Sequence, residues 1–134
     1  MIDRLFAYGT LRAPELLHSV IGRRIEGTPA VLEGYICRRV RHTDYPAICQ
    51  RTGSSTQGSV YCGIDAPAWW RLDAFESNLY ERSVVEISQA GSANSMAYTY
   101  VIADAYKKRL TDEAWVLEHF RHSHLNRYLS QFHS

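Results

Sequence analysis

FAYGTLR at residues 6–12 and LDAFESNLYER at residues 72–82 are the two stretches from which the architecture and the chemistry of this chain can be argued. In the first, apolar residues alternate up to Tyr8 and Gly9 follows. This indicates a strand that ends in a tight turn, because glycine turns without the steric cost of a Cβ atom. If the amides of Tyr8, Gly9, Thr10 and Leu11 face a cavity, they form a concave site for a carboxylate or an oxyanion. An ordinary tight turn is the commoner structure for such a stretch, so the residues alone leave both interpretations open.

The second stretch places one carboxylate on the apolar side of a helix. Trp69, Leu72 and Glu76 are spaced i, i+3 and i+7, so Glu76 points the same way as the apolar residues. Burial and the negative end of the helix dipole both raise the pKa of a carboxyl group there. A glutamate with a pKa nearer neutrality suits a general base that later acts as a general acid. A glutamate bonded to a loop amide, or paired with an arginine, is the alternative.

The pattern along the chain is one of strands separated by short helices. Strands are expected over residues 2–8, 34–40, 59–64, 82–88 and 96–102, helices over 14–21 and 66–76 and from about 111, and loops over 53–56 and 91–95. Asp65 is a candidate cap for the second helix, and Thr111 for the last. We therefore expect one domain over residues 1–134 with an α+β fold and a largely antiparallel sheet.

The composition excludes several classes of protein. A formal net charge of +1 over 134 residues argues against a nucleic-acid binder that relies on a broad positive field. No apolar run approaches the roughly 20 residues that a membrane span needs. The three cysteines, Cys37, Cys49 and Cys62, are too few for a disulfide framework, and we expect buried or half-buried free thiols in a cytoplasmic protein.

Four motifs, in this order and spacing, resemble one known superfamily. They are FAYGTLR at residues 6–12, YPAI at 45–48, Gly58-x-Val60-Tyr61, and Leu72-Asp73-x-Phe75-Glu76-x-x-x-Tyr80-x-Arg82. Together they are similar to the γ-glutamylcyclotransferase-like superfamily over about residues 4–103, most nearly to its γ-glutamylamine cyclotransferase and avirulence-induced-protein branch. The resemblance implies a small mixed β-barrel with peripheral helices.

The resemblance also implies a reaction and roles for individual residues. A γ-glutamyl amide would be cleaved by its own α-amine, which releases 5-oxoproline and a free amine without a metal or an organic cofactor. Glu76 would be the catalytic carboxylate, and Tyr8, Gly9, Thr10 and Leu11 would form the loop that holds the substrate. Arg82 and Tyr100 match further positions of the family and are counted with the substrate-binding residues. For Arg82 a structural role, such as orienting a carboxylate, is the alternative, and for Tyr100 it is an inward core tyrosine with a satisfied hydroxyl. The expected partner is a small γ-glutamyl molecule, with no nucleic acid and no membrane, and a monomer is the default state.

Two positions depart from the family pattern. Ser77 stands where the family often has glycine after the glutamate. Thr10-Leu11 replaces the Ser-Asn pair of the branch that acts on γ-glutamyl amino acids, so that substrate class is in doubt. A module that binds a small molecule or a peptide on the same scaffold without turnover is the competing hypothesis.

Other polar residues have simpler interpretations. His119, His122 and His124 are expected on a solvated helix face, because their spacing spreads them around the helix. Asp73 is likewise expected to face solvent. The basic cluster at residues 38–42 is interpreted as part of a surface strand.

Overall fold

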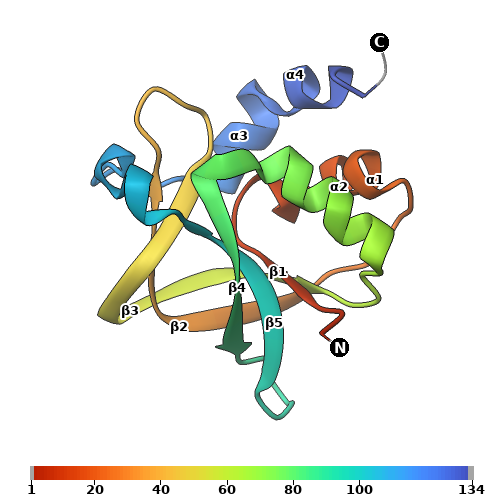
Figure 1. Cartoon of the computed structure of the whole chain (residues 1–134), viewed down its shortest axis with the longest axis horizontal. Helices are drawn as coiled ribbons and strands as arrows, with labels where there is room; N and C mark the ends of the chain where they lie inside the picture. Colours follow the sequence, from red (N-terminus) through yellow and green to blue (C-terminus); the bar gives the residue numbers. More distant parts are fainter. Residues whose placement is uncertain (1, 133–134) are drawn as a thin grey trace.

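The computed structural model describes residues 2–132. Its main element is a curved five-stranded sheet (Figure 1). The strands are β1 (Leu5–Ala7), β2 (Thr28–Arg39), β3 (Pro46–Tyr61), β4 (Tyr80–Ile87) and β5 (Ser95–Ile102). They lie in the order β2-β3-β1-β5-β4, and neighbours are antiparallel except β1 and β5. The expected α+β class with a largely antiparallel sheet is therefore confirmed.

The sheet curves strongly but does not close into the expected barrel. Its edge strands meet at a bridge between Val31 of β2 and Ser88, just after β4, with N···O distances of 2.9 and 3.0 Å. Beyond this bridge β2 pairs with β3, and its register shifts at Gly34, where φ is +83°. Because the edges separate there, the sheet is better described as open at one end.

The loop that was expected at residues 53–56 lies inside β3. Glu33 pairs with Ser55 and Tyr35 pairs with Gln50, so residues 51–54 of β3 face the single residue Gly34. The Gly-Ser-rich stretch is thus a wide bulge in a long strand, and pairing with β2 on both sides of it overrides its turn-like composition.

Two helices have the bounds that the sequence predicts, α1 (Pro14–Ile21) and α2 (Ala66–Glu76). The carboxylate of Asp65 caps α2, because its Oδ1 accepts a hydrogen bond from the amide of Ala68 at 3.0 Å. Three 3₁₀ turns complete this part of the chain: η1 (Thr10–Arg12), η2 (Ser77–Leu79) and η3 (Asp104–Arg109).

The C-terminal helix begins later than expected and is broken in two. Its parts are α3 (Leu117–Ser123) and α4 (Leu125–Ser130), separated by His124 at φ −131°. Thr111 does not cap a helix, because its hydroxyl donates to the carbonyl of Arg39 at 2.7 Å and ties this segment to β2. The expected start near residue 111 was therefore wrong by about two turns.

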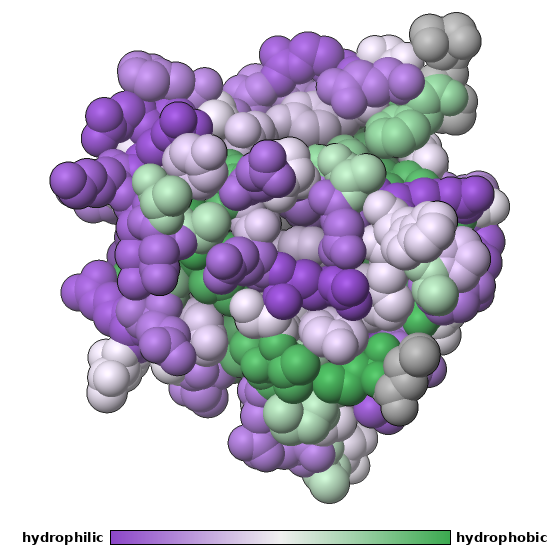
Figure 2. All heavy atoms as spheres, in the orientation of Figure 1, coloured by the Kyte–Doolittle hydropathy of each residue, from purple (hydrophilic) through white to green (hydrophobic). Residues whose placement is uncertain are grey.

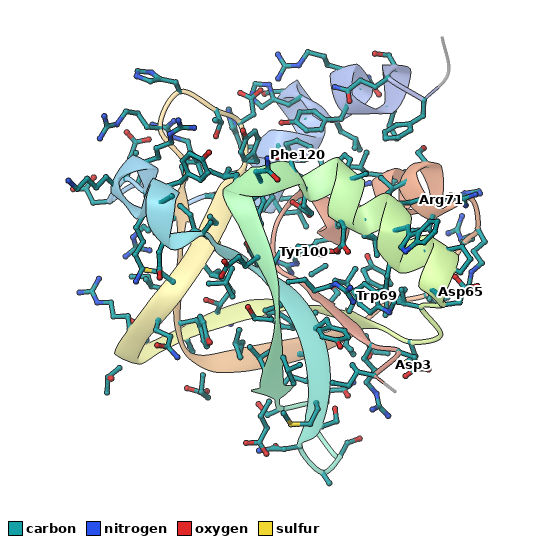
Figure 3. The ribbon with its side chains drawn as sticks, in the orientation of Figure 1. Asp3, Asp65, Trp69, Arg71, Tyr100 and Phe120 are labelled. Atoms are coloured by element: carbon teal, nitrogen blue, oxygen red, sulfur yellow. The ribbon has the colours of Figure 1, made fainter. Side chains whose placement is uncertain are left out.

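The core lies on both faces of β1. Leu5 and Ala7 face a cluster with α1, α2 and Phe120 of α3, while Phe6 and Tyr8 face the inner surface of the curved sheet. Figure 3 shows Trp69 and Tyr100 between α2 and the strands. The chain leaves β1 directly into the Tyr8–Leu11 turn, so the best-buried strand of the sheet positions that turn.

The surface is mostly polar in the view of Figure 2, with apolar side chains gathered over β4 and β5, where Val84 and Met96 are exposed. The three cysteines are free; Cys37 and Cys49 are half-buried, whereas Cys62 is exposed, contrary to expectation. Within residues 2–132, no helix combines the length and the apolar character that crossing a membrane would require.

Candidate active site

A pocket of about 640 Å³ opens beside the C-terminal end of β1. Most of its walls come from β1 with the turn that follows it, α2 with Ser77 after it, the start of β3 with Tyr45 before it, the first residue of β4, and α4 with the two residues after it. Val20 of α1 and Tyr100 of β5 complete the lining. Glu76, Tyr8, Gly9, Thr10, Leu11 and Tyr100, which the sequence marked as site residues, all line it. The topology thus joins residues that lie up to 92 positions apart.

The Tyr8–Leu11 turn forms one wall of the pocket. Gly9 packs so closely on β3 that a Cβ atom there would lie 2.8 Å from Cγ of Pro46. The first hydrogen bond of the 3₁₀ turn η1 runs from the amide of Arg12 to the carbonyl of Gly9, at 3.0 Å. The amides of Thr10 and Leu11 precede this bond and have no partner within the turn, so they can donate to a ligand.

Glu76 ends α2 at the opposite wall and is half-buried. Burial raises the pKa of its carboxyl group to about 8. Among residues 2–132, no lysine, arginine or histidine forms an ion pair with it. The alternative in which Glu76 pairs with an arginine is therefore not found in the part of the chain that the structure describes. The carboxyl group of Glu76 is available to exchange a proton near neutral pH.

Ser77, directly after Glu76, has a backbone conformation that suits glycine. Its φ is +67° and its ψ is −170°, a region that residues with a side chain rarely occupy. Such a conformation costs on the order of 1–3 kcal/mol in a non-glycine residue. The departure from the family pattern at this position is therefore accommodated by strain in the backbone that carries the glutamate.

Tyrosine hydroxyls make up most of the polar surface around Glu76. Tyr8 donates to the carbonyl of Tyr100, and Tyr80 donates to the carbonyl of Pro46 at 2.6 Å. Burial raises the pKa of both, and the nearby Glu76 charge raises it further. Tyr128 of α4 also feels that charge, although burial is again the main reason that its pKa rises to about 12. All these hydroxyls stay protonated at neutral pH and serve as neutral donors.

Three of the lining tyrosines, Tyr45, Tyr80 and Tyr128, were not chosen as site residues from the sequence. Tyr45 and Tyr80 both stand inside the motifs that carry the resemblance, so their place in those motifs was a usable signal. Tyr128 had no such signal, because it lies outside those motifs, in the C-terminal helical region.

Arg82 is not among the residues that line the pocket. Its guanidinium lies between two aromatic rings, 4.7 Å from the ring centre of Trp69 and 4.5 Å from that of Tyr98. Its Nε pairs with Oδ1 of Asp73 at 3.1 Å, and the same oxygen accepts from the hydroxyl of Tyr100 at 2.7 Å. Asp73, expected simply to face solvent, instead links Arg82 to a pocket tyrosine.

The outer wall of the pocket is aromatic. Phe75 and Phe132 lie with ring centres 6.3 Å apart, and Tyr128 and Gln131 come from the same C-terminal segment. Arg71, the one lining residue with a positive charge, lies where α2 meets α1 (Figure 3), and its Nη1 donates to the carbonyl of Ile21 at 2.8 Å.

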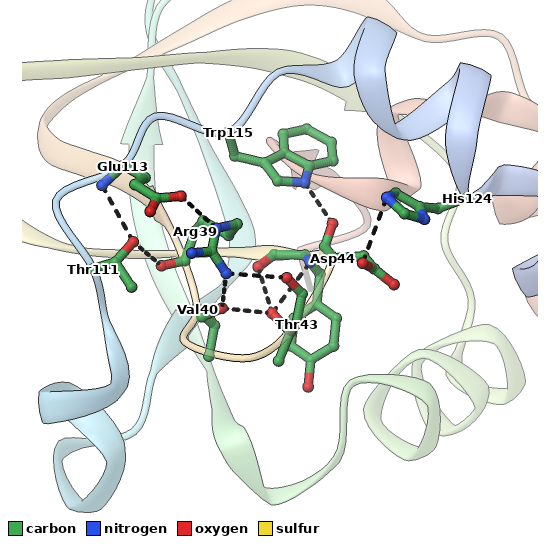
Figure 4. Close-up of polar contacts among 9 residues, drawn as sticks. Arg39, Val40, Thr43, Asp44, Thr111, Glu113, Trp115 and His124 are labelled. Atoms are coloured by element: carbon green, nitrogen blue, oxygen red, sulfur yellow. Dashed lines mark hydrogen bonds and ion pairs between the residues drawn. The ribbon is translucent and has the colours of Figure 1, made fainter.

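The loop between β2 and β3, which precedes Tyr45 and Pro46 in the pocket wall, is held by the C-terminal segment (Figure 4). The indole of Trp115 donates to the carbonyl of Asp44 at 2.7 Å, and His124 lies 3.5 Å from the carboxylate of Asp44. His124 is thus half-buried rather than on a solvated face. Across residues 2–132, no three His, Cys, Asp or Glu side chains gather in a way that could hold a metal ion.

Comparison with known proteins gives one consistent result. Residues 5–117 match the family model described as gamma-glutamyl cyclotransferase, AIG2-like. AIG2-like protein A of Arabidopsis thaliana is 26% identical over 132 residues, which cover 98% of this chain and 79% of that protein. AIG2-like protein C of the same plant is 30% identical over 118 residues, 87% of this chain and 68% of that protein.

Solved structures agree with this result. The solution structure of an Arabidopsis thaliana protein superimposes with a TM-score of 0.74 and 27% identity, covering 98% of this chain and 79% of that one. A structure titled gamma-glutamyl cyclotransferase gives a TM-score of 0.68 over 98% of this chain and 86% of its own. At 16% identity, the second likeness concerns the fold alone.

Proposed function

The chain belongs to the AIG2-like gamma-glutamyl cyclotransferase family, and on that premise we propose that it converts a γ-glutamyl amide into 5-oxoproline and a free amine. The observation that carries the proposal is the position of Glu76. It is a half-buried carboxyl group with a pKa near 8, in a pocket whose opposite wall has amide donors to spare.

Ring closure in this reaction is intramolecular. The nitrogen of the substrate's α-amine attacks the γ-carbonyl carbon, a new C–N bond forms, and the bond to the departing amine breaks. Holding the amine and the carbonyl in line supplies much of the rate, because aligned intramolecular groups react as if at very high concentration. No water is consumed, and neither step needs a metal or a cofactor.

Glu76 handles the proton. As a carboxylate it takes a proton from the α-ammonium group, which frees the attacking nitrogen, and it then gives that proton to the nitrogen of the leaving amine. The attacking nitrogen loses a second proton as the lactam forms, and the released amine takes up this proton as its ammonium form, so Glu76 ends as a carboxylate again. A carboxyl group with a pKa near 8 can do both near neutral pH, because neither the acid nor the carboxylate form is strongly disfavoured there.

The Tyr8–Leu11 turn positions the glutamyl half of the substrate. The amides of Thr10 and Leu11 are suited to a carboxylate or to the developing oxyanion of the γ-carbonyl. Arg82 and Asp73 act through Tyr100, whose hydroxyl they fix, so we assign them as positioning residues rather than as groups that touch the substrate.

The test is release of 5-oxoproline from a panel of γ-glutamyl amides by the purified protein. We expect turnover by the native protein and a loss of about 10²–10⁴-fold in Glu76→Gln. Glu86→Gln is the matched control, because Glu86 is exposed on β4 and away from the pocket. N-acetyl-γ-glutamyl amides should be inert, since their nitrogen cannot attack.

Two results would contradict the proposal. Full activity in Glu76→Gln would rule out the assigned proton transfer. Binding of γ-glutamyl amides without product, across the whole panel, would favour the competing hypothesis of a binding module on the same scaffold. We place the reaction in the cytoplasm and assign it to a monomer, and the three free thiols support the reducing compartment.

A further inference from the structure

The pocket has two chemically different ends, and the outer one bears on the leaving amine. Once the glutamyl half lies between Glu76 and the Tyr8–Leu11 turn, its scissile bond is next to Glu76. The rest of the amine must then extend along the walls that remain. These are formed by Phe75, Gln131 and Phe132, with Tyr45 and Tyr128 where the walls meet the surroundings of Glu76.

We propose that the leaving amine is a neutral amine with an aromatic or bulky apolar group, rather than a lysine-like or polyamine cation. This inference rests on the proposed cyclotransferase function. These walls offer aromatic faces, the neutral hydroxyls of Tyr45 and Tyr128 and one neutral amide, and Phe75 and Phe132 already lie in a ring contact at 6.3 Å that a third ring can extend.

The charges of the pocket support the same conclusion. Among residues 2–132, Glu76 and Arg71 are the charged side chains that line it. Glu76 is engaged in proton transfer, so a second positive charge on the amine would find no free carboxylate on these walls. Arg71 would repel such a charge. Moving a cation from water to an aromatic wall without a partner is costly, although ring faces offset part of that cost.

Asp44, next to the lining residue Tyr45 in the loop between β2 and β3, is already paired. Asp44 is in contact with both Arg127 and His124, and it is not among the lining residues. It therefore does not supply the missing negative charge. The preference for a neutral amine therefore follows from two features of the lining residues described: aromatic rings are among them, and a free carboxylate for a distal ammonium group is not.

The experiment compares two amides with the same glutamyl half. γ-Glutamyl-benzylamide carries a neutral ring, and the γ-glutamyl amide of 1,5-diaminopentane carries a distal ammonium. We expect kcat/KM to favour the benzylamide by at least about tenfold. Equal or higher kcat/KM for the cationic amide would overturn the inference while leaving the proposed function intact.

A charge introduced into the outer wall should change this ratio. Phe132→Glu places a carboxylate there, on a side chain that is 40% exposed and so tolerates the change. We expect the preference to fall at least fivefold, a change of about 1 kcal/mol. Met96 is exposed on β5 and lies outside the pocket, so Met96→Glu should leave the preference unchanged. The same ratio in both variants would count against the assignment of the outer wall to the amine.

Binding separates the two proposals if no amide is turned over. The glutaric acid monoamides of the same two amines lack the α-amine and cannot cyclise, so their affinities can be measured by calorimetry. Tighter binding of the benzylamide would uphold the inference even if the cyclotransferase function fails. Tighter binding of the cationic amide would reject it.

Discussion

The inner and outer ends of the pocket are built in different ways. At the inner end, three tyrosine hydroxyls are fixed by hydrogen bonds to a carbonyl or to Asp73, and Gly9 packs against Pro46 without space for a methyl group. The outer end consists of ring contacts on α4 and the residues after it. Partly exposed ion pairs, Arg121 of α3 with Glu15 and Arg127 of α4 with Asp44, hold the two C-terminal helices to the rest of the molecule.

This difference in construction suits two different tasks: the inner end suits the proposed reaction, and the outer end suits the choice of amine. The proposed proton transfer and ring closure require fixed geometry. The residues assigned to them stand at the C-terminal ends of β1 and of α2, where small displacements are costly. Recognition of a leaving group tolerates more variation, because apolar contact is not directional. We therefore expect substitutions at the inner end to cost activity and stability together, and substitutions at the outer end to change mainly the choice of amine.

The largest effect should come from the inner carboxyl group through pH. Unfolded, Glu76 loses its proton near 4.5, whereas in the folded protein it does so near 8. Between these values the folded state binds more protons, so stability falls as the pH rises through this window. Glu76→Gln cannot ionise and should be more stable than the native protein by about 2–4 kcal/mol at pH 9.

Below pH 4 the same substitution should make little difference, because both states of the native protein are then protonated. Urea unfolding at pH 4, 7 and 9 measures this, with Glu86→Gln as the control. A stability difference that does not vary with pH would show that Glu76 is not desolvated in the folded protein.

The next largest effect concerns the Tyr8–Leu11 turn. Gly9→Ala forces Pro46 or the turn to move, since the new methyl group would lie 2.8 Å from Cγ of Pro46. We expect about 2 kcal/mol of lost stability and about a hundredfold lower kcat/KM. Gly91→Ala, at φ +78° in the distant β4–β5 hairpin, should lose stability but keep its activity. Unchanged activity in Gly9→Ala would separate the turn from the reaction.

Arg82 tests whether geometry reaches the pocket through Asp73 and Tyr100. Arg82→Leu removes the ion pair and the cation contacts with Trp69 and Tyr98. Because Arg82 is away from the pocket wall, kcat should fall about tenfold while KM changes less than about twofold. Arg82→Lys should recover part of the loss. A large rise in KM at constant kcat would instead place Arg82 in contact with the substrate.

A smaller effect is expected at the strained residue after Glu76. Ser77→Gly should stabilise the protein by about 1 kcal/mol, because glycine adopts a φ of +67° without steric cost but loses more entropy on folding. Ser77→Ala keeps a Cβ atom and should therefore give no gain in stability. Thermal unfolding at pH 7 compares the three proteins, and a lower melting temperature for the glycine variant would contradict the strain.

The smallest effect belongs to the outer end. Arg121→Ala removes a partly exposed pair that holds α3 to Glu15 of α1, and should cost about 0.5 kcal/mol. The pair lowers the pKa of Glu15, so its contribution exists above the ordinary carboxyl pKa and disappears as the pH falls below it. Equilibrium unfolding at pH 7 and pH 3 measures this. A loss as large as that of Gly9→Ala would remove the distinction between the two ends.

Local signals were enough to predict the helix that carries the glutamate. Asp65 as a cap, Pro67 in the first turn and the spacing of Trp69, Leu72 and Glu76 all act within one helix, and α2 has the predicted bounds. The strand before Gly9 was equally readable, because the alternation of Leu5, Phe6 and Ala7 corresponds to two separate core clusters.

Features that depend on pairing between distant segments could not be read in this way. Tyr45, Tyr80 and Tyr128 line the pocket together with Glu76 because the curved sheet brings the start of β4 to the start of β3, where the hydroxyl of Tyr80 donates to the carbonyl of Pro46, and because α4 lies at the same pocket. The bulge in β3 exists because β2 pairs on both sides of it. Thr111 had the composition of a cap, but the carbonyl of Arg39 competes for its hydroxyl.

The place of β1 in the sheet has a consequence for how the protein is made. This three-residue strand lies between residues 59–61 of β3 and Tyr98 of β5. The Tyr8–Leu11 turn is therefore translated well before Tyr98, and β1 gains its second neighbour only after Tyr98 has emerged from the ribosome. Such long-range pairing slows folding, because the intervening chain must be closed into a loop first. The pocket is thus completed late in folding, around a segment that was translated well before one of its two neighbours.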